Sequence, residues 1–340
     1  MAKISMGFSI NINDGQHVFE VNDDEAILDA ALREDIGLPY GCRNGACGNC
    51  ISTLKAGEVG YPEGKTRALE GAPENSCLTC QARPKSDVSL AVKVVETASE
   101  IEVRTLPCRV HKHEALAHDV MAIWLKLPEG QRLQFMAGQY LNFVLSDGRE
   151  RAFSIANAPH DDEFIELHIR HVDGGEFTDY VFDKLQDKAI MRIRGPLGTF
   201  FLREDSERPV VFVAGGTGFA PIKGQIEHAL HIGDKRPMHL YWGVRSKRDL
   251  YQAELVKQWA SENDNIHFVP VLSEPDEDWG GRSGFVHEAV VADHPDMSGF
   301  DVYMAGPPVM VDAGKNAFIE AGLSTDYMFS DSFDFANDKK

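Results

Sequence analysis

Four cysteines, spaced C-x4-C-x2-C-x29-C, constrain this chain more than any other feature of its sequence. Cys42, Cys47 and Cys50 lie in the segment GCRNGACGNC, and Cys80 lies much further along the chain. Three thiolates in one tight loop and a fourth from a distant segment are the ligand arrangement of a [2Fe-2S] cluster. Glycines between the cysteines leave room for the inorganic sulfides and let the backbone turn toward them. The spacing therefore predicts a domain that carries single electrons.

A zinc site and a set of buried thiols are the alternative interpretations of these cysteines. Zinc sites use two short Cys-x2-Cys pairs, and the two pairs present here would leave Cys42 without a role. The fourth cluster ligand is a choice between Cys77 and Cys80. We favour Cys80, because an apolar residue lies two positions before it and a strand-like run follows. Cys77 and Cys108 are then spare thiols.

Composition limits the class of protein. The chain has 340 residues, of which 43% are hydrophobic, enough for two or three packed domains. We expect a cytoplasmic protein, because there is no basic-then-apolar leader, no apolar run long enough to span a bilayer and no disulfide framework. The formal charge of −19 disfavours nucleic acid and anionic membranes as partners, since both would be repelled. It is compatible with docking to a basic patch on another protein.

Residues 1–97 alternate apolar and polar positions in two runs separated by Asn-Asp-Gly, a strong hairpin signal. A helix follows, with Asp23 or Asp24 as its N-cap, and then the cysteine loop and a final strand. The expected elements are strands over 4–12, 16–21 and 88–95 and a helix over 27–32. This order predicts a β-grasp ferredoxin domain, with residues 96–102 as a linker.

Two further segments complete a multidomain fold of the β and α/β classes. Residues 98–206 show short, closely spaced strands and one helix starting near Thr178, which predicts an antiparallel β-barrel. Residues 207–340 alternate strand-like and helical runs, which predicts a doubly wound parallel α/β sheet. The barrel strands are expected over 104–111, 120–126, 140–145, 150–156, 165–171 and 189–194. The sheet is expected to have strands over 209–214, 239–243, 266–271 and 301–305 and helices over 221–230 and 252–261.

The barrel segment carries a candidate flavin site. Arg151, Phe153 and Ser154 offer a cation for a pyrophosphate, a planar ring to lie against the flavin and a hydrogen-bonding group near N5. An ordinary strand with a surface arginine is the alternative. The run Gly174-Gly175-Glu176-Phe177-Thr178 precedes the helix, and its final threonine can cap that helix beside a pyrophosphate. The run Gly195-Pro196-Leu197-Gly198 is expected to be a turn after a strand.

Two glycine turns predict a nucleotide site in the α/β segment. Gly215-Gly216-Thr217-Gly218 follows a strand and precedes a helix, where backbone amides point at phosphate. Gly306-Pro307-Pro308-Val309-Met310 holds the same kind of position after a later strand, so both turns can border one crevice. Between them, Arg245, Lys247 and Arg248 are either contacts for the adenosine half of a dinucleotide or a solvated turn.

The order of these motifs resembles the ferredoxin-NADP reductase superfamily in its form with an N-terminal ferredoxin domain. Reductase components of ring-hydroxylating dioxygenases, phenol hydroxylases and methane monooxygenase have this form. The resemblance extends from Ile10 to Phe333. The runs SIAN, LHIR, GGTGFAPIK and GFVH look most similar to CDP-6-deoxy-glucoseen reductase and to the terephthalate dioxygenase reductase.

The resemblance implies roles for the matching positions. Ser154 and Phe333 are the candidate catalytic residues, and both are expected beside the flavin ring. The candidate FAD contacts are Arg151, Phe153, Ser154, His168, Arg170, Gly175, Phe177 and Thr178. The candidate nicotinamide-nucleotide contacts are Gly215, Gly216, Thr217, Gly218, Arg245, Gly306, Pro307 and Met310.

Two positions depart from the family pattern. Phe153 stands where tyrosine is common, so a phenolic hydrogen bond to the ribityl chain is missing while ring stacking is kept. Ala305 replaces the cysteine that begins the C-G-P-P motif beside the nicotinamide. We expect hydride transfer to persist with a changed geometry or rate, because the chemistry belongs to the cofactors.

The expected activity is that of an NAD(P)H-dependent iron-sulfur flavoprotein reductase. NADH gives a hydride to FAD, and electrons leave singly through the [2Fe-2S] cluster to an oxygenase or hydroxylase component. The alternatives are a CDP-deoxysugar 3-dehydrase as acceptor, or a redox-sensing protein. Arg245, Lys247 and Arg248 would suit NADPH, whereas Asp249 would accept a ribose hydroxyl of NADH, and we favour NADH.

Overall fold

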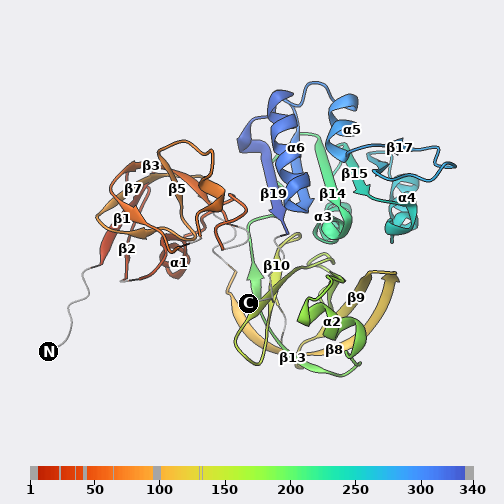
Figure 1. Cartoon of the computed structure of the whole chain (residues 1–340), viewed down its shortest axis with the longest axis horizontal. Helices are drawn as coiled ribbons and strands as arrows, with labels where there is room; N and C mark the ends of the chain where they lie inside the picture. Colours follow the sequence, from red (N-terminus) through yellow and green to blue (C-terminus); the bar gives the residue numbers. More distant parts are fainter. Residues whose placement is uncertain are drawn as a thin grey trace. The chain divides into compact units, whose positions relative to one another are not determined.

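The computed structural model describes residues 7–22, 24–34, 36–40, 44–63, 65–94, 101–129, 131 and 133–333 (Figure 1). Its contacts divide the chain into two compact units, Met1–Glu102 and Val103–Lys340. The cluster ligand candidate Cys42, the cap candidate Asp23 and residues 96–100 of the predicted linker lie outside the described residues. The predicted boundary between residues 206 and 207, inside the second unit, stays a prediction.

The first unit is a β-grasp domain, as predicted. Its described residues form a main sheet of five strands in the order β2-β1-β7-β3-β5, in which β1 and β7 run parallel. Helix α1 contacts β2 and contributes Ile27 and Leu28, both fully buried, to the core. The elements are β1 Phe8–Ile12, η1 Asn13–Gly15, β2 His17–Val21, α1 Ile27–Arg33, β3 Ile51–Ala56, β4 Val59–Gly60, η2 Arg67–Leu69, β5 Ser76–Leu78, β6 Arg83–Pro84 and β7 Val88–Ala91.

The start of α1 corrects one prediction. Asp24 lies before the helix, with a left-handed φ of 64°, and the helix begins only at Ile27. The first backbone N–H groups find other acceptors, because Ile27 N–H donates to Ala82 O and Leu28 N–H donates to Thr79 O, both at 3.0 Å. The segment that carries Cys80 therefore satisfies the helix terminus directly, in place of a side-chain cap from Asp24.

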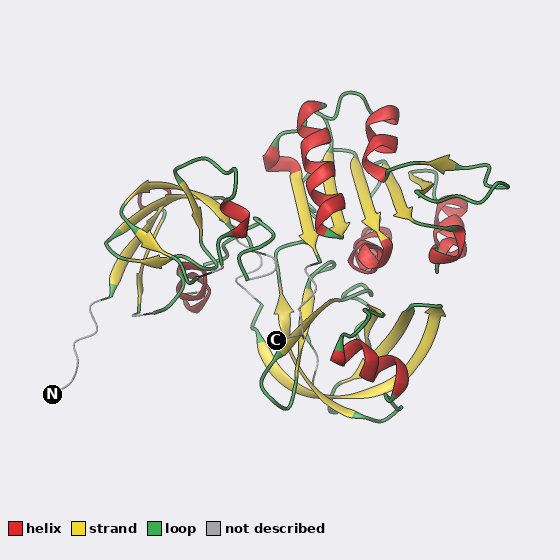
Figure 2. Cartoon of the chain, in the orientation of Figure 1, coloured by secondary structure: helices red, strands yellow, loops and turns green. Residues whose placement is uncertain are grey.

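The second unit begins with the predicted antiparallel barrel. Six strands of its described part lie in the order β11-β10-β13-β8-β9-β12, and a bridge between Ile155 and Leu167 brings the two ends of the sheet together (Figure 2). Alternate apolar residues fill the interior, among them Cys108, where burial raises the thiol pKa to about 12. The elements are β8 Arg104–Ala117, β9 Val120–Lys126, β10 Tyr140–Val144, β11 Glu150–Ser154, β12 Ile165–Arg170, α2 Glu176–Asp183 and β13 Ile190–Leu197.

Two local predictions for the barrel were wrong. Helix α2 is capped by Gly175, and Thr178 lies inside the first turn, where its hydroxyl donates back to Gly175 O at 3.1 Å. A Cβ on Gly175 would lie 2.8 Å from Thr178 Oγ1, so the close approach of this hydroxyl favours glycine at the cap. Gly195, Pro196 and Leu197 belong to β13 itself and do not form a turn after it.

The remainder of the second unit is the predicted doubly wound parallel sheet. Its described strands follow the order β17-β16-β15-β14-β18-β19, and all neighbouring pairs are parallel. Helices cover both faces, because Phe212 packs with α3 and α4 while the next residue, Val213, packs with α5 and α6 (Figure 2). The sequence analysis did not predict β17, β19, α5 or α6. The elements are β14 Val210–Gly215, η3 Gly216–Gly218, α3 Phe219–His231, β15 Met238–Val244, η4 Lys247–Asp249, α4 Ala253–Glu262, β16 Ile266–Leu272, β17 Arg282–Ser283, α5 Val286–Asp293, β18 Asp301–Gly306, α6 Pro308–Glu320, η5 Thr325–Tyr327 and β19 Met328–Ser332.

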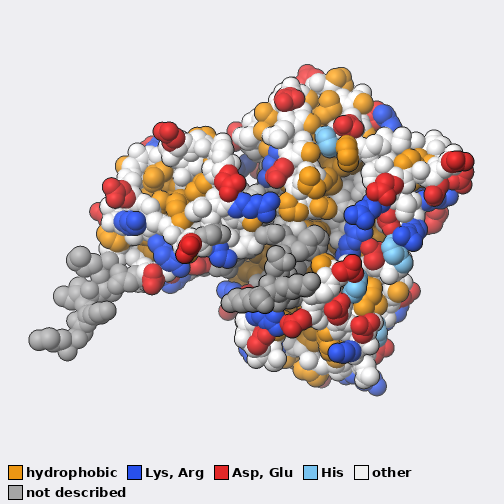
Figure 3. All heavy atoms as spheres, in the orientation of Figure 1, with side chains coloured by type: hydrophobic (Ala, Val, Ile, Leu, Met, Phe, Trp, Pro, Cys, Tyr) orange, Lys and Arg blue, Asp and Glu red, His pale blue; other side chains and the backbone are white. Residues whose placement is uncertain are grey.

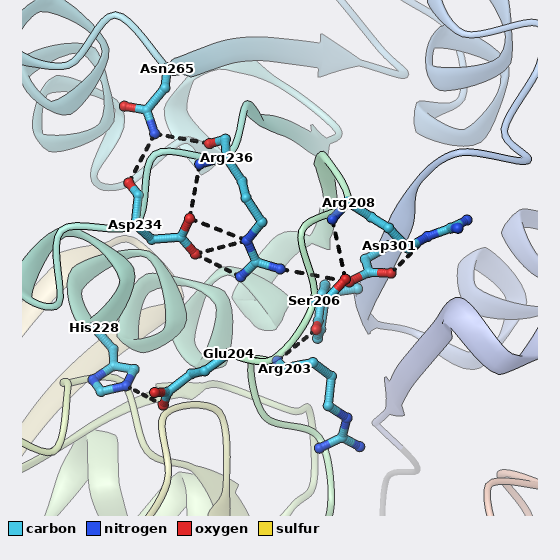
Figure 4. A network of polar contacts seen from close by, with 10 residues as sticks. Arg203, Glu204, Ser206, Arg208, His228, Asp234, Arg236, Asn265 and Asp301 are labelled. Carbon is cyan, nitrogen blue, oxygen red and sulfur yellow. Dashed lines mark hydrogen bonds and ion pairs between the residues drawn. The ribbon is translucent and has the colours of Figure 1, made fainter.

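A buried ion-pair network joins the amino ends of β14, β15 and β18 (Figure 4). Asp301 is 1% exposed, and its carboxylate lies 3.2 Å from Arg208 Nε and 3.7 Å from Arg236 Nη1. Arg236 also binds Asp234 at 2.6 Å, and the Arg208 guanidinium lies 3.7 Å from the centre of the Tyr327 ring. The network therefore fixes the starts of three strands relative to one another.

Charged side chains of both signs are interspersed on the face of the molecule drawn in Figure 3. Among the helices of the described residues, none has the length and apolar character needed to cross a membrane.

Three histidines that lie together where β15, β16 and the end of α5 meet predict a loss of stability in acid. The His239 ring lies 4.7 Å from that of His267 and 4.8 Å from that of His294. Burial and the charges of His294 and His267 lower the pKa of His239 to about 4 from 6.5. At a pH between these two pKa values, His239 binds a proton in the unfolded chain but not in the folded chain. The free energy of unfolding therefore decreases as the pH falls through this window.

We expect the melting temperature to fall between pH 7.5 and pH 5, and to fall less in His239→Gln. Thermal unfolding followed by circular dichroism at both pH values measures the difference. An equal fall in the two proteins would contradict this account of His239.

Candidate functional site

The described cysteines of the cluster motif lie close together. The Cys50 thiol is hydrogen-bonded to both the side chain and the backbone N–H of Cys80, and an ionised Cys47 would raise the pKa of Cys50. The main chain joins the same segments, since the N–H and the hydroxyl of Thr79 donate to Cys50 O at 3.2 and 3.1 Å. Thiolates from one loop and from a distant segment are the donor set that a [2Fe-2S] cluster needs, so these residues fit the cluster.

Cys77, the alternative fourth ligand, has a different environment. It is fully buried on β5, and its side chain is hydrogen-bonded to the Tyr61 hydroxyl. The same hydroxyl accepts the Leu78 N–H at 3.2 Å. Cys77 has a hydrogen-bond partner outside the cysteine motif, whereas Cys80 is hydrogen-bonded to Cys50. The geometry therefore favours Cys80 as the ligand.

The path of the cluster loop requires glycine. Gly45 and Gly48 have left-handed φ angles of 89° and 77°. A Cβ on Gly45 would lie 2.2 Å from Lys65 O, and the Ala68 N–H donates to Gly45 O at 3.0 Å. The loop is therefore held against residues 65–68, in a conformation that a side chain at position 45 would prevent.

The two glycine turns predicted to bind nucleotide lie side by side at the carboxyl ends of β14 and β18. These strands are parallel neighbours, with Ala214 paired to Ala305. A Cβ on Gly215 would lie 2.5 Å from Met310 Sδ, and one on Gly218 would lie 1.8 Å from Ala305 O. The backbone contact at Gly218 requires glycine there, the two turns are closely packed at Gly215, and such an edge of a parallel sheet suits a nucleotide.

The last strand of the sheet brings a carboxylate to this edge. Asp331 of β19 pairs with Ala305 and is 8% exposed. The Ser154 hydroxyl of β11 lies 3.2 Å from Asp331 Oδ2 and donates to it. The Phe333 N–H donates to Gly306 O at 2.9 Å. Both candidate catalytic residues, Ser154 and Phe333, are thus hydrogen-bonded to residues at the carboxyl edge of the sheet, where the glycine turns lie.

Arg170 lies between the barrel and the first glycine turn. Its Nε and Nη2 each lie 2.8 Å from Asp119 Oδ2, in the hairpin between β8 and β9. A Cβ on Gly216 would lie 2.7 Å from Arg170 Nη1, and Gly216 has a φ of 55°. The left-handed φ favours glycine at 216, and the turn approaches this cation closely.

The flavin strand presents a cation and an aromatic ring. The Phe153 ring is half-buried and lies 5.8 Å from Phe143 and 5.4 Å from Phe177. Phe177 is 5% exposed, so its ring belongs to the barrel core, and the Phe153 ring packs against it. Burial and the charge of Arg149 lower the pKa of Arg151, so an anion bound there would be stabilised. These residues fit a flavin with its pyrophosphate.

The His168 side chain belongs to a buried network. Its Nε2 lies 2.8 Å from Glu166 Oε1 and its Nδ1 lies 3.0 Å from the Tyr251 hydroxyl. Burial opposes ionisation of Glu166, but the hydrogen bond from His168 and the charge of Lys223 lower its pKa to about 2. The ring of His168 is therefore engaged on both nitrogens.

The cations expected near adenosine follow β15. Arg245 is exposed, and its carbonyl accepts the Glu274 N–H at 2.9 Å. Asp249 Oδ2 accepts the N–H and the hydroxyl of Ser246 at 2.9 and 3.1 Å, and the Asp249 side chain is 11% exposed. A second carboxylate, Glu274, lies two residues after the end of β16, and its backbone N–H is the group bonded to Arg245 O.

Asp331 and Lys223 are the residues of this region that the sequence analysis missed. The one signal in the sequence that could have identified Asp331 is its place two residues before Phe333. Lys223 is 5% exposed on α3, inside a helix that reads as ordinary and amphipathic. Their importance depends on contacts between distant strands and helices, which no local pattern contains.

Three families of domain match the chain in sequence. A 2Fe-2S iron-sulfur cluster binding domain matches residues 10–85, an oxidoreductase FAD-binding domain matches 107–202 and an oxidoreductase NAD-binding domain matches 212–316. Together with the fold, these matches define an iron-sulfur flavoprotein that oxidises a nicotinamide nucleotide.

Similar proteins and similar solved structures indicate the same class of protein. The chain is 40% identical over 328 residues to the CDP-6-deoxy-L-threo-D-glycero-4-hexulose-3-dehydrase reductase of Yersinia pestis, covering 96% of this chain and 99% of the relative. It is 35% identical to the phenol hydroxylase P5 protein of Acinetobacter pittii, covering 94% and 92%. The cytochrome P-450 reductase of Amycolatopsis has a similar structure, with a TM-score of 0.78, 34% identity and coverage of 96% and 98%. The chain belongs to the ferredoxin-NADP reductase superfamily, in the form with an N-terminal [2Fe-2S] domain.

Proposed function

We propose that this chain takes a hydride from NADH and delivers single electrons to a separate acceptor protein. The contact between Ser154 and Asp331 carries the proposal, because it joins the flavin strand of the barrel to the nucleotide edge of the sheet. When bound, FAD accepts the hydride and the [2Fe-2S] cluster passes electrons on singly. The protein itself supplies binding, orientation and the hydrogen bonds at the point where the two sites meet.

The residues of the chain divide into three binding sets. The Ser154 hydroxyl donates a hydrogen bond to Asp331, which fixes the direction of the hydroxyl. The proposed cluster ligands are Cys42, Cys47, Cys50 and Cys80. The proposed FAD contacts are Arg151, Phe153, Ser154, Gly175, Thr178 and the backbone of 168–170. The proposed NADH contacts are Gly215–Gly218, Arg245, Gly306, Pro307 and Met310, with Phe333 beside the flavin.

The acceptor is proposed to be an oxygenase or hydroxylase component, because the chain is 35% identical to a protein named as the phenol hydroxylase P5 protein. A CDP-hexulose 3-dehydrase is the second candidate, which the 40% identity to the Yersinia pestis reductase favours. The formal charge of −19 favours an acceptor with a basic docking surface. A cytoplasmic location is also proposed, because cluster thiolates require a reducing compartment; cell fractionation with a tagged chain tests it.

Anaerobic titration of the purified protein with NADH tests the proposed function. We expect flavin and iron-sulfur absorption that both bleach on addition of NADH. The reduced protein is then mixed with a dehydrase loaded with its substrate, or with an oxygenase component, and reoxidation by one of them identifies the acceptor class. A protein without flavin absorption, or one that NADH does not bleach, would show the proposal to be wrong.

The coenzyme site predicts a preference for NADH. Glu274 lies beside Arg245, and it begins the acidic run Glu-Pro-Asp-Glu-Asp, which would repel a 2′-phosphate. Because Glu274 is exposed, its effect is screened, and we expect Glu274→Gln to raise kcat/KM for NADPH by about threefold to fivefold, which corresponds to about 1 kcal/mol. Steady-state rates with both coenzymes measure this change.

The variant Glu254→Gln, which removes an exposed carboxylate on α4, is the matched control and is expected to change neither rate. A wild-type preference for NADPH that disappears in Arg245→Ala would show that the cations decide the specificity and that Glu274 does not.

A further inference from the structure

Three consecutive residues of α3 are buried although two of them are polar. Lys223 is 5% exposed, Gln225 is 0% exposed and Gly224 between them is buried. A buried lysine needs partners for its charge, and a buried glutamine needs hydrogen bonds. Helix α3 begins directly after the glycine turn Gly215–Gly218, so whatever holds these residues also holds that turn.

All three residues meet the barrel. Lys223 Nζ donates to Ala156 O at 3.2 Å and to Glu166 Oε2 at 3.1 Å. Gln225 Nε2 donates to Phe200 O at 3.3 Å. A Cβ on Gly224 would lie 2.9 Å from Asn157 O, so the helix backbone is in close contact with the barrel. The second turn of α3 is thus attached to three separate barrel segments.

The lysine also connects back to the glycine turn through buried side chains. Glu166 binds His168, and His168 binds the Tyr251 hydroxyl at 3.0 Å. The Tyr251 ring lies 5.1 Å from that of Trp242, edge to face, and Trp242 Nε1 donates to Gly216 O at 3.0 Å. Every link is a direct contact. Lys223 is therefore connected to the glycine turn twice, through the α3 backbone and through this series of side chains.

We propose that Lys223 is a positioning residue for hydride transfer, which sets the separation between the nucleotide turn and the flavin strand. Ala156 lies two residues after Ser154, and Lys223 lies five residues after Gly218. The bond from Lys223 to Ala156 O therefore ties together the two segments that would hold the reacting partners. The inference rests on the proposed function. A displacement of about 1 Å at such a distance can slow a reaction by about a hundredfold.

The main variant is Lys223→Met combined with Glu166→Gln, which removes the charge pair between these two residues. The other partner of Lys223 is Glu227, whose carboxylate lies 3.0 Å from Nζ and whose side chain is 26% exposed, so it keeps contact with solvent in the variant. We expect flavin bleaching at saturating NADH, measured by rapid mixing, to slow by about tenfold to a hundredfold. The dissociation constant for NADH and the flavin absorption are expected to stay unchanged. Amide hydrogen exchange in α3 and β12 is expected to become faster, which is a readout independent of turnover.

Gly224→Ala is the second variant, and it tests the same idea without altering charge. The added methyl group would press on Asn157 O and move the helix away from the barrel, so slower bleaching is expected again. Lys257→Met is the matched control, because it removes a lysine from an exposed ion pair on α4. It is expected to bleach at the wild-type rate.

Bleaching at the wild-type rate in both test variants would overturn the proposal. So would a slower rate that is fully explained by weaker NADH binding, since Lys223 would then act on affinity. A wild-type protein that NADH does not bleach would instead refute the proposed function. In that case unchanged hydrogen exchange in the variants would separately refute the role of Lys223 in attaching α3 to the barrel.

Discussion

Replacement of Cys80 by serine is expected to abolish the iron-sulfur cluster and leave the flavin in place. The Cys80 side chain and backbone both bond to Cys50, so its thiolate is placed to complete the ligand set. Without it, iron content is expected to fall from about two atoms per chain to nearly none. Reduction of a one-electron acceptor protein is expected to fall by more than about a hundredfold, while NADH still bleaches the flavin, because the flavin and nucleotide residues lie in the other unit. Iron analysis, electron paramagnetic resonance and cytochrome c reduction measure these changes.

Cys77→Ser is the matched control for this prediction. Cys77 is as deeply buried and lies three residues away, but its partner is the Tyr61 hydroxyl. We expect this variant to keep its cluster and its electron transfer. Loss of the cluster in Cys77→Ser together with its retention in Cys80→Ser would reverse the assignment of the fourth ligand.

Replacement of Asp301 by asparagine is expected to lower the free energy of unfolding of the second unit by about 3 kcal/mol. Its carboxylate is 1% exposed and lies against Arg208 and Arg236. Asparagine keeps the shape but removes the charge, so two guanidinium groups lose a buried counter-charge at the starts of β14, β15 and β18. Denaturant unfolding followed by tryptophan fluorescence measures the loss.

An exposed carboxylate on a helix of the same unit provides the comparison. Glu254 pairs with Lys257 on α4, with both side chains largely in solvent, and Glu254→Gln is expected to cost less than about 0.5 kcal/mol. A cost for Asp301→Asn as small as this would mean that the network in Figure 4 contributes little to stability.

The sequence predicted those features that a short segment specifies by itself. The cysteine spacing, the strand-like runs such as Val120–Lys126 and the two glycine turns each have a local cause, namely ligand number, residue alternation and the need for close backbone approach. The three-domain order followed from them. Strand β19 was missed because Met-Phe-Ser-Asp-Ser does not alternate cleanly, and it becomes a strand by pairing with β18.

The rest of the site depends on contacts between segments that are distant in sequence. Ser154 and Asp331 are 177 positions apart, and only the closure of the barrel against the sheet joins them. The cap of α1 was mispredicted for a related reason, since the segment around Cys80 supplies the acceptors in place of Asp24.

The parallel pairing of β1 with β7 has a consequence for how this protein is made. The first strand of the iron-sulfur domain can find its central neighbour only after residues 88–91 have left the ribosome. Pairing of such distant segments is slow, because a long loop must close before contacts form. The cysteine loop is synthesised well before this event, so its thiols are exposed on the nascent chain. Metal delivery during biosynthesis therefore has a window that begins before the domain has folded around its ligands.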